Sequence, residues 1–140
     1  MRQIKFRAWD GKRKAMYKPD SFVFSADGDV TAVWRKEYDG TTVGGLDPEK
    51  GRMTLMQYTG QKDNNGREIY EDDIVRVVGV TQPGMKWVVT WANASWELHH
   101  VLGGKYMTPM RLATMSVPIE VNGNVHETPE LMEVRDEREY

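Results

Sequence analysis

Apolar and polar residues alternate at the start of the chain. Ile4, Phe6 and Ala8 are separated by Lys5 and Arg7, which is the two-residue period of a strand with one buried face. An Asp-Gly pair follows at 10–11 and offers the positive φ that a tight hairpin turn needs. The pattern predicts a β-hairpin whose first strand lies within 1–10 and whose second strand ends near residue 17.

The same arrangement recurs along the chain. The runs 21–26 and 30–34 flank an Ala-Asp-Gly-Asp turn and predict a second hairpin. Further strand-like runs, each bounded by turn residues, lie at 53–59, 74–80, 85–91, 96–101 and 117–121. A Thr-Gln-Pro-Gly turn is predicted at 81–84, and 107–115 is ambiguous. Short strands at this spacing indicate a barrel or a sandwich.

Two segments depart from this pattern. The stretch 38–52 holds four glycines and few apolar side chains, which predicts a long surface loop that is either mobile or used for binding. Near the end, Thr128 can cap a helix, Pro129 suits a first helical position and Leu131 supplies an apolar contact. One or two helical turns are expected there, followed by a frayed, charged tail at 135–140.

Length and composition narrow the possibilities. At 140 residues and 16.1 kDa, the chain is expected to form a single domain over 1–140. Lysines and arginines number 19 against 21 acidic residues, so no global field draws the protein to nucleic acid or to an anionic membrane. There is no cysteine, and no apolar run long enough for a membrane span or a signal peptide. A cytoplasmic protein is expected.

Acidic residues suggest two metal sites. The segment 61–72 can be laid on a calcium loop with Asp63, Asn65 and Asp72 as ligands, but Gln61 stands where such a loop begins with an acid. The neighbouring carboxylates Glu71, Asp72 and Asp73 can be imagined around Mg²⁺ in a hydrolase or nuclease. An Asn/Gly turn whose carboxylates accept backbone N–H groups explains both segments more simply.

No known catalytic pattern is present. Adjacent His99 and His100 point to opposite faces of a strand, which argues against a shared metal ion. The serines lack a nucleophile elbow, and neither a phosphate-binding loop nor a dinucleotide fingerprint occurs. We therefore predict no catalytic residue, no metal and no cofactor.

Aromatic residues offer a candidate binding surface. Trp87 and Trp91 share one face of a strand, and Trp96 follows on the next. These rings are either core side chains or a surface for a peptide, a base or another subunit, with Trp96 expected to be the more exposed. The basic N-terminal hairpin, with Lys5, Arg7 and Arg13, is the one plausible footprint for nucleic acid.

Three strings carry a family resemblance. They are Met-Arg-Gln-Ile-Lys-Phe-Arg-Ala-Trp-Asp at 1–10, Leu-Met-Gln-Tyr-Thr-Gly at 55–60 with Asp-Asn-Asn-Gly-Arg-Glu-Ile-Tyr-Glu-Asp-Asp-Ile-Val at 63–75, and Ile-Glu-Val-Asn-Gly-Asn-Val-His-Glu-Thr-Pro-Glu-Leu at 119–131. Together they resemble the YopX family of phage and prophage proteins, over essentially the whole chain. The residues that carry the central motif, and that are expected to be structural, are Tyr58, Gly60, Gly66, Glu68, Ile69, Tyr70 and Asp73.

The resemblance implies a mostly β architecture with an SH3-like barrel, a phage or prophage origin and no established biochemical activity. Two positions depart from the family pattern. Asp72 stands where the family usually has Gly, so a positive φ there would cost up to about 1 kcal/mol. The pair Asn122-Gly123 predicts a hairpin by itself, whereas the resemblance implies a bent, continuous final strand, which we favour.

These observations predict a mainly β protein with a small SH3-like β-barrel, additional N-terminal β-hairpins and a short C-terminal helix. The hairpins and the long loop occupy 1–52, the barrel core 53–128, and the helix with its tail 129–140. The leading hypothesis for function is a non-catalytic interaction module that self-associates and binds an unidentified protein. Nucleic-acid binding through the basic hairpin and exposed aromatics is the alternative, and a Mg²⁺-dependent hydrolase is a third.

Overall fold

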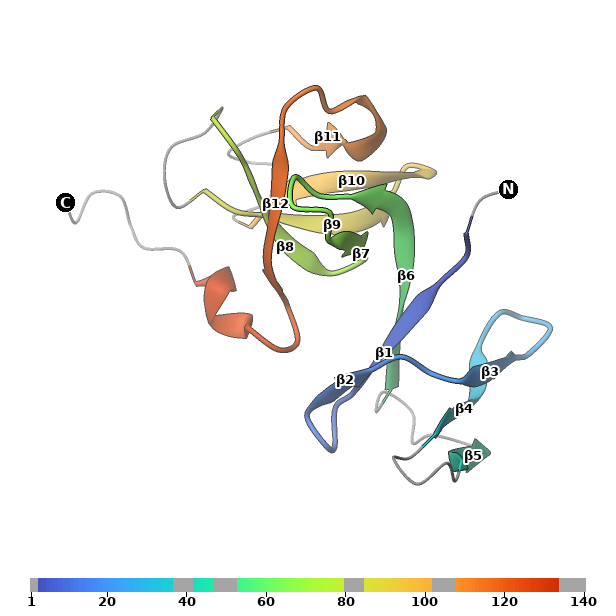
Figure 1. The fold of residues 1–140 in the computed structure, drawn as a ribbon. Helices are drawn as coiled ribbons and strands as arrows, with labels where there is room; N and C mark the ends of the chain where they lie inside the picture. Colours follow the sequence, from blue (N-terminus) through green and yellow to red (C-terminus); the bar gives the residue numbers. More distant parts are fainter. Residues whose placement is uncertain (1–2, 37–41, 47–52, 80–84, 102–107, 134–140) are drawn as a thin grey trace. The chain divides into compact units, whose positions relative to one another are not determined.

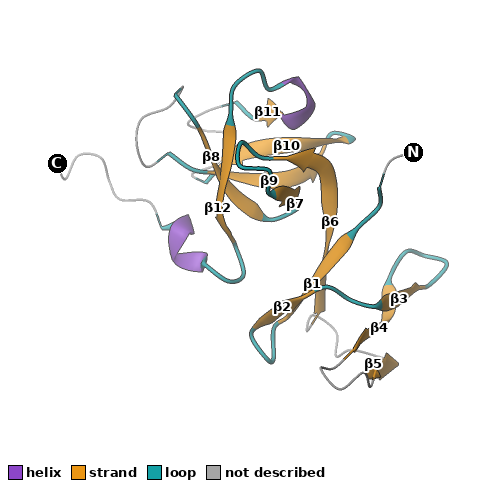
Figure 2. Ribbon diagram, viewed as in Figure 1, coloured by secondary structure: helices purple, strands orange, loops and turns teal. Residues whose placement is uncertain are grey.

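The computed structural model describes residues 3–36, 42–46, 53–79, 85–101 and 108–133, and within these residues the protein is mainly β with two short 3-10 helices (Figures 1 and 2). The chain divides into two compact units. Unit 1 comprises Met1–Gln3 and Tyr58–Tyr140, and unit 2 comprises Ile4–Gln57. The boundary falls within one strand, β6 (Met53–Lys62), whose two halves belong to different units.

Unit 2 contains the first predicted hairpin. Strand β1 (Phe6–Asp10) pairs antiparallel with β2 (Ala15–Tyr17) on one side and with the first half of β6 on the other. The buried carboxylate of Asp10 accepts hydrogen bonds from the backbone N–H groups of Lys12 (3.0 Å) and Arg13 (3.2 Å). Asp10 thereby fixes the turn at 11–14. The hairpin is confirmed, but the positive φ is found at Lys14 (54°) and not at Gly11, where the sequence predicts it.

Unit 2 also contains a three-stranded sheet in the order β3-β4-β5. Its strands are β3 (Ser21–Phe24), β4 (Val30–Lys36) and β5 (Thr42–Leu46). The pairing of β3 with β4 confirms the second hairpin, and a register shift between Val23 and Phe24 bends it. Ala32 and Val33 of β4 are buried.

Strand β5 corrects the prediction of a loop over 38–52. Thr42–Leu46 pairs antiparallel with β4, from Lys36 opposite Thr42 to Ala32 opposite Leu46. A ladder needs only backbone N–H and C=O groups, so a Gly-containing edge strand forms without the apolar alternation used for prediction. The remaining residues, 38–41 and 47–52, lie outside the described part of the chain.

Unit 1 is built on a curled, half-barrel sheet of five strands in the order β11-β10-β9-β8-β12 (Figure 1). The strands are β8 (Asp73–Val77), β9 (Trp87–Ala92), β10 (Ser95–His100), β11 (Met110–Arg111) and β12 (Ile119–Asn124). A further short strand, β7 (Glu68–Tyr70), pairs with the second half of β6. The predicted SH3-like barrel is confirmed only to the extent of this curled sheet.

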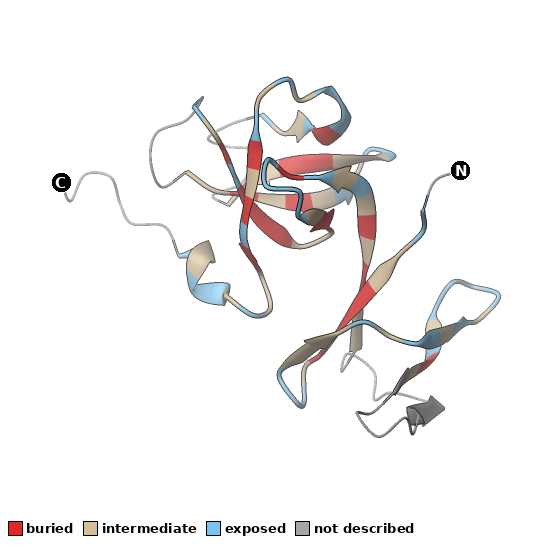
Figure 3. Cartoon of the chain, in the orientation of Figure 1, coloured by how far each residue is buried: buried red, intermediate tan, exposed pale blue. Residues whose placement is uncertain are grey.

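The inner face of this sheet forms the core of unit 1 (Figure 3). Trp87, Val89 and Leu98 are fully buried at its centre. They come from neighbouring strands β9 and β10, where cross-strand pairs point to the same face. The cluster is completed by Ile69, Val75, Val77, Leu112, Ile119 and Val121.

The final strand is continuous, as the resemblance implies. β12 pairs antiparallel with β8 along its length, and the register shifts between Val121 and Gly123, so Asn122 forms a bulge instead of a hairpin turn. Gly123 is buried, and a Cβ there would overlap with Thr128 Oγ1 and lie 3.0 Å from Leu131 Cδ1. The bulge therefore sits where only glycine fits beside the next segment.

The C-terminal helix is confirmed in part. Pro129–Met132 forms a 3-10 helix, but the Thr128 side chain does not cap it. The hydroxyl donates to the Asn124 carbonyl instead (2.9 Å). A second 3-10 helix, Leu112–Thr114, follows β11 and resolves the ambiguous segment 107–115 from Met110 onward. The predicted turn at 81–84 and the tail at 135–140 lie outside the described residues.

Candidate functional site

The family-motif residues gather at the corner formed by β6, β7 and the start of β8. Tyr58 and Tyr70 are cross-strand partners, and their ring centroids are 5.6 Å apart. Ile69 is buried in the core of unit 1, and its carbonyl accepts a hydrogen bond from the Thr59 hydroxyl (2.8 Å). The tyrosine pair and Ile69 therefore anchor this corner.

Two glycines shape the corner. Gly60 has φ 90° and Gly66 has φ 80°, a region that residues with a Cβ rarely occupy. The pairing of β6 with β7 shifts register between Tyr58 and Lys62, and Glu68 lies opposite Lys62. The irregular pairing and the positive φ values explain the glycines of the motif as structural residues.

Asp63 joins the corner to the last strand of the sheet. Its Oδ1 accepts hydrogen bonds from the backbone N–H groups of Asn65 (2.8 Å) and Arg67 (2.9 Å). Its Oδ2 accepts a third, from the N–H of Val121 in β12 (2.9 Å). The Asn64 N–H also donates to the Ile119 carbonyl (2.8 Å). A single carboxylate thus closes the turn between β6 and β7 and fastens it to β12.

The surroundings of Asp63 favour its charged form. Burial raises the pKa of this carboxyl, but the N–H groups of Val121, Arg67 and Asn65 outweigh burial, and the Arg67 guanidinium adds to their effect. The pKa of Asp63 therefore lies below its ordinary value of 3.8. Asp63 is ionised at neutral pH and acts as a structural acceptor.

Asp73 and Asp72 serve the next turn in different ways. Asp73 is 1% exposed, and its Oδ2 accepts a hydrogen bond from the Tyr70 N–H (2.8 Å). Asp72 has φ 68°, so the position where the family usually has Gly does adopt a positive φ, and the conditional cost stated for Asp applies. Its N–H donates to the Val89 carbonyl (2.9 Å), and its carbonyl accepts from Val125 (3.0 Å). The Asp72 backbone thereby holds β9 and the segment after β12 together.

The side chain of Asp72 adds a contact that the sequence did not indicate. Its Oδ2 lies 2.9 Å from His126 Nε2, and 30% of the Asp72 side chain and 19% of the His126 side chain are exposed. The two residues are 54 positions apart. Only the tertiary pairing of β8 with β12 brings them together, so no local signal in the sequence could have linked them.

Asn124 organises the turn that carries His126. Its side-chain oxygen accepts hydrogen bonds from the N–H groups of His126 (3.0 Å) and Glu127 (2.8 Å), and its Nδ2 donates to Glu127 Oε1 (2.9 Å). Asn124 is 2% exposed. Sequence reasoning missed this role, although Asn is a frequent residue in such turns.

The acidic residues of the two hypothetical metal sites are directed to separate partners. Asp63 binds backbone N–H groups, Asp72 faces His126 and Asp73 is buried against Tyr70. Within the described residues, no group of three or more His, Cys, Asp or Glu side chains is arranged to hold a metal ion. The structure therefore does not assemble Glu71, Asp72 and Asp73 into the arrangement that the third hypothesis requires.

Trp91 and Trp96 form an aromatic pair at the end of the β9–β10 hairpin. Their ring centroids are 5.0 Å apart with an interplanar angle of 70°, an edge-to-face contact. Trp96 packs against the core of unit 1, as do Met110, Met115 and Val117. Trp91 is 54% exposed. The two rings therefore extend the apolar inner face of the sheet from the core to the solvent-exposed surface.

The expectation that Trp96 is the more exposed ring is wrong. Trp91 is the exposed one, because β8 pairs with β9 only at Trp87 and Val88 and leaves Trp91 beyond the end of its neighbour. Trp87 is fully buried, so for this ring the structure selects the core role over the binding surface.

The basic candidates do not form one exposed surface. Arg13 is exposed, Lys5 is half-buried and Arg7 is buried. Arg7 lies on β1 opposite Met56, with β2 and β6 on either side of that strand, so its burial corrects its assignment to a nucleic-acid footprint. Lys12, Arg13 and Lys14, at the tip of the first hairpin, are the exposed cations of this region.

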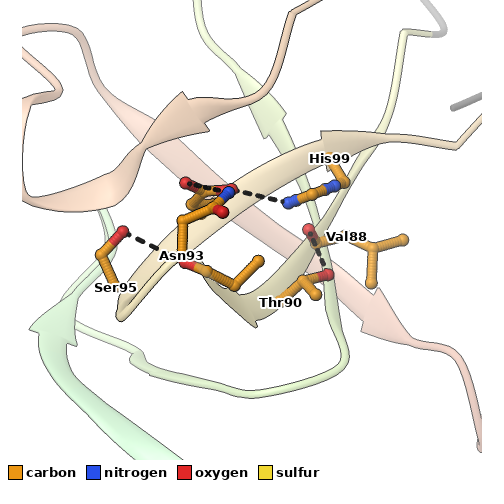
Figure 4. Close-up of polar contacts among 7 residues, drawn as sticks. Val88, Thr90, Asn93, Ser95 and His99 are labelled. Atoms are coloured by element: carbon orange, nitrogen blue, oxygen red, sulfur yellow. Dashed lines mark hydrogen bonds and ion pairs between the residues drawn. The ribbon is translucent and has the colours of Figure 1, made fainter. Parts of the chain in front are cut away.

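The histidine pair follows the predicted geometry. His100 is buried with its ring centroid 5.1 Å from that of Trp87, whereas His99 lies on the other face with Nε2 3.0 Å from Glu97 Oε1 (Figure 4). Asn93 Nδ2 lies 3.5 Å from both oxygens of Glu97. The two histidines thus serve different environments and cannot share an ion.

The chain matches a known protein family. The YopX protein family matches residues 5–133, and the chain belongs to this family. No curated protein matches the chain.

Two solved structures share the fold. Protein yopX from Bacillus subtilis has a TM-score of 0.66 and 24% identity, and protein EF1440 from Enterococcus faecalis has a TM-score of 0.61 and 23% identity. Each comparison covers 95% of this chain and 100% of the other. Among the described residues, no helix is long and apolar enough to cross a membrane.

Proposed function

We propose that this protein is a phage- or prophage-derived, non-catalytic interaction module that works in the cytoplasm of the bacterial host and self-associates. The family match extends across both units, which supports treating 1–140 as one YopX-like domain. The motif residues stabilise the corner between β6, β7 and β8, and the carboxylates of the candidate acids accept hydrogen bonds from backbone N–H groups in turns. These structural roles favour a scaffold over a catalyst.

The exposed ring of Trp91 is the observation that carries this proposal. A tryptophan that is 54% exposed, in edge-to-face contact with a second ring and backed by a buried core, offers a rigid apolar contact. Aromatic residues of this kind are enriched at the centres of protein interfaces. Trp91 is therefore proposed to bind a partner protein.

Affinity capture from cells that carry the phage or prophage tests the Trp91 surface. The tagged protein is compared with Trp91→Lys and with a control, Arg13→Glu, which changes an exposed residue of unit 2. Trp91→Lys should lose at least about tenfold of the recovered partner, because hot-spot truncations cost about 2 kcal/mol or more. Equal recovery with Trp91→Lys would refute the Trp91 contact.

Self-association is tested separately by light scattering coupled to size exclusion. The wild-type protein should have the mass of a dimer or larger species at high micromolar concentration. A monomeric mass throughout that range would contradict this part of the proposal.

Nucleic-acid binding is the second candidate, favoured by the three consecutive exposed cations at 12–14. It predicts salt-sensitive association with single-stranded DNA or RNA, weakened when Lys12, Arg13 and Lys14 are changed to Glu. Arg7 is left unchanged in this experiment, because a charge reversal at a buried residue would disturb folding. No gel shift at low salt would exclude this candidate.

A further inference from the structure

The outer edge of β3 is unpaired within the described part of the chain. β3 is an end strand of the sheet in unit 2, and no described strand pairs with its far side. Edge strands that resist association usually carry lysine, proline or an inward-pointing charge. The segment 21–26, Ser-Phe-Val-Phe-Ser-Ala, contains none of these.

Exposed apolar side chains accompany this edge. Val23 is 50% exposed and Phe24 is 46% exposed. The ring of Phe24 lies 5.0 Å from that of Phe22, which in turn lies 4.8 Å from Phe6 of β1. The open backbone edge is thus bordered by an aromatic cluster that reaches solvent.

We propose that two copies of this chain associate by pairing their β3 strands antiparallel about Val23, an inference that rests on the self-association proposed above. A two-fold axis perpendicular to the sheet keeps equivalent faces of the two sheets on the same side. Val23 then faces Val23 of the second copy, and Phe22 of each copy faces Phe24 of the other. Both aromatic clusters become continuous across the junction.

Charge favours a second copy as the occupant, and aromatic pairing favours the register centred on Val23. The neutral segment 21–26 does not repel its own copy. Exposed Lys18 and Asp20 lie before β3, whereas exposed Asp27 and Asp29 lie after it. An antiparallel pair brings Lys18 of each copy toward the two aspartates of the other. A register centred on Phe22 instead would place Asp20 opposite Phe24, which loses an aromatic pair.

Opposite charges at position 23 test the pairing directly. Sedimentation velocity of the full chain is measured from low to high micromolar concentration for the wild type, Val23→Lys, Val23→Asp and an equimolar mixture of the two variants. Each variant alone should raise the dimer dissociation constant at least about tenfold, because like charges face each other and apolar contact is lost. The mixture should recover dimers, because lysine then faces aspartate across the axis.

Ala113→Lys serves as the matched control, since it introduces lysine at an exposed apolar residue of unit 1. It should leave the dissociation constant unchanged, and the wild-type circular dichroism spectrum should be retained by all variants. A monomeric wild type would overturn both the self-association and this pairing. Dimers that persist in both Val23 variants would overturn the β3 contact alone, and a mixture that stays monomeric would overturn the register.

Discussion

Asp72 has a left-handed backbone conformation with φ 68°, which glycine adopts at lower energy than any residue with a Cβ. Asp tolerates this region better than most residues with a Cβ, at a cost of up to about 1 kcal/mol. The contact of its carboxylate with His126 and the two hydrogen bonds of its backbone offset this strain. Asp72 therefore has a strained backbone conformation but connects β8 to the segment after β12.

Removing the Asp72 carboxylate in two ways separates the strain from the contact. Asp72→Ala and Asp72→Gly both lose the link to His126, but only alanine keeps a Cβ at positive φ. Asp72→Gly should therefore be more stable than Asp72→Ala by about 1 kcal/mol. Urea unfolding of the two variants measures the difference in free energy.

Asp20 provides the control for this comparison, because it is not among the described residues with positive φ. The order there should be reversed, since glycine loses more backbone entropy on folding than alanine. Equal stability of Asp72→Ala and Asp72→Gly would mean that the backbone at this turn is unstrained.

Residue-scale predictions from the sequence were uneven. The positive φ of Asp72 could be anticipated, because the family usually has Gly at this position and a glycine often marks a residue with positive φ. The contacts of Asp72 with His126 and of Asp63 with Val121 were not predictable. The first joins residues 54 positions apart, and the second uses a backbone N–H, which every residue except proline carries.

The bulged strand β12 shows how an element depends on one small residue. Gly123 lies against Thr128 and Leu131, so a Cβ at this position would overlap with the Thr128 hydroxyl. That hydroxyl already bonds to both the N–H (3.0 Å) and the carbonyl (2.9 Å) of Asn124. It has little freedom to move away.

Gly123→Ala should lower stability by about 2 kcal/mol, since overpacking of a tight site costs about 1–3 kcal/mol. Thermal unfolding measures the loss. Thr128→Ala should be less harmful in the Gly123→Ala background than in the wild type, because it removes the overlapping oxygen. Additive losses in the double variant would show that this overlap is not the source of the effect.

Elements were predicted well where side chains define them. The hairpins of β1 with β2 and of β3 with β4 have alternating side chains and an Asp-Gly pair in the connection. Both hairpins are confirmed, although in the first the positive φ falls at Lys14 and not at Gly11. β5 was missed because its pairing depends on the backbone, and the order of exposure of Trp91 and Trp96 was wrong because it depends on where β8 stops pairing. Local sequence does not contain the length of a neighbouring strand.

At the scale of the whole molecule, Asp63 couples stability to pH. Its folded-state pKa lies below 3.8, so the unfolded chain binds the proton more readily. The stabilisation is complete above the ordinary carboxyl pKa and is lost as the pH falls through the lowered value. Acid therefore releases the corner between β6 and β7 from β12.

Asp63→Asn should lose about 2–3 kcal/mol at neutral pH, because an uncharged amide then faces three backbone donors. The difference in the free energy of unfolding between Asp63→Asn and the wild type should become smaller as the pH falls below the ordinary carboxyl pKa. Urea unfolding across this pH range measures both. Exposed Asp27→Asn is the control and should change little. A gap independent of pH would refute the role of the Asp63 charge.

The fold class and the family were the most predictable properties of the whole molecule. Many short alternating runs indicated a mainly β chain, and strings at both ends and in the middle indicated the YopX family, which the match over 5–133 confirms. The strand order β11-β10-β9-β8-β12 could not be derived, because it is set by packing between distant segments.

The carboxylate of Asp63 also has a consequence for how the chain matures. Its third donor, Val121, is 58 residues downstream, so during synthesis the corner must wait for that amide to leave the ribosome. Closing so long a loop is slow compared with forming a local hairpin. The N-terminal hairpins should therefore form early during synthesis, whereas the hydrogen bond between Asp63 and Val121 should form among the last events of folding.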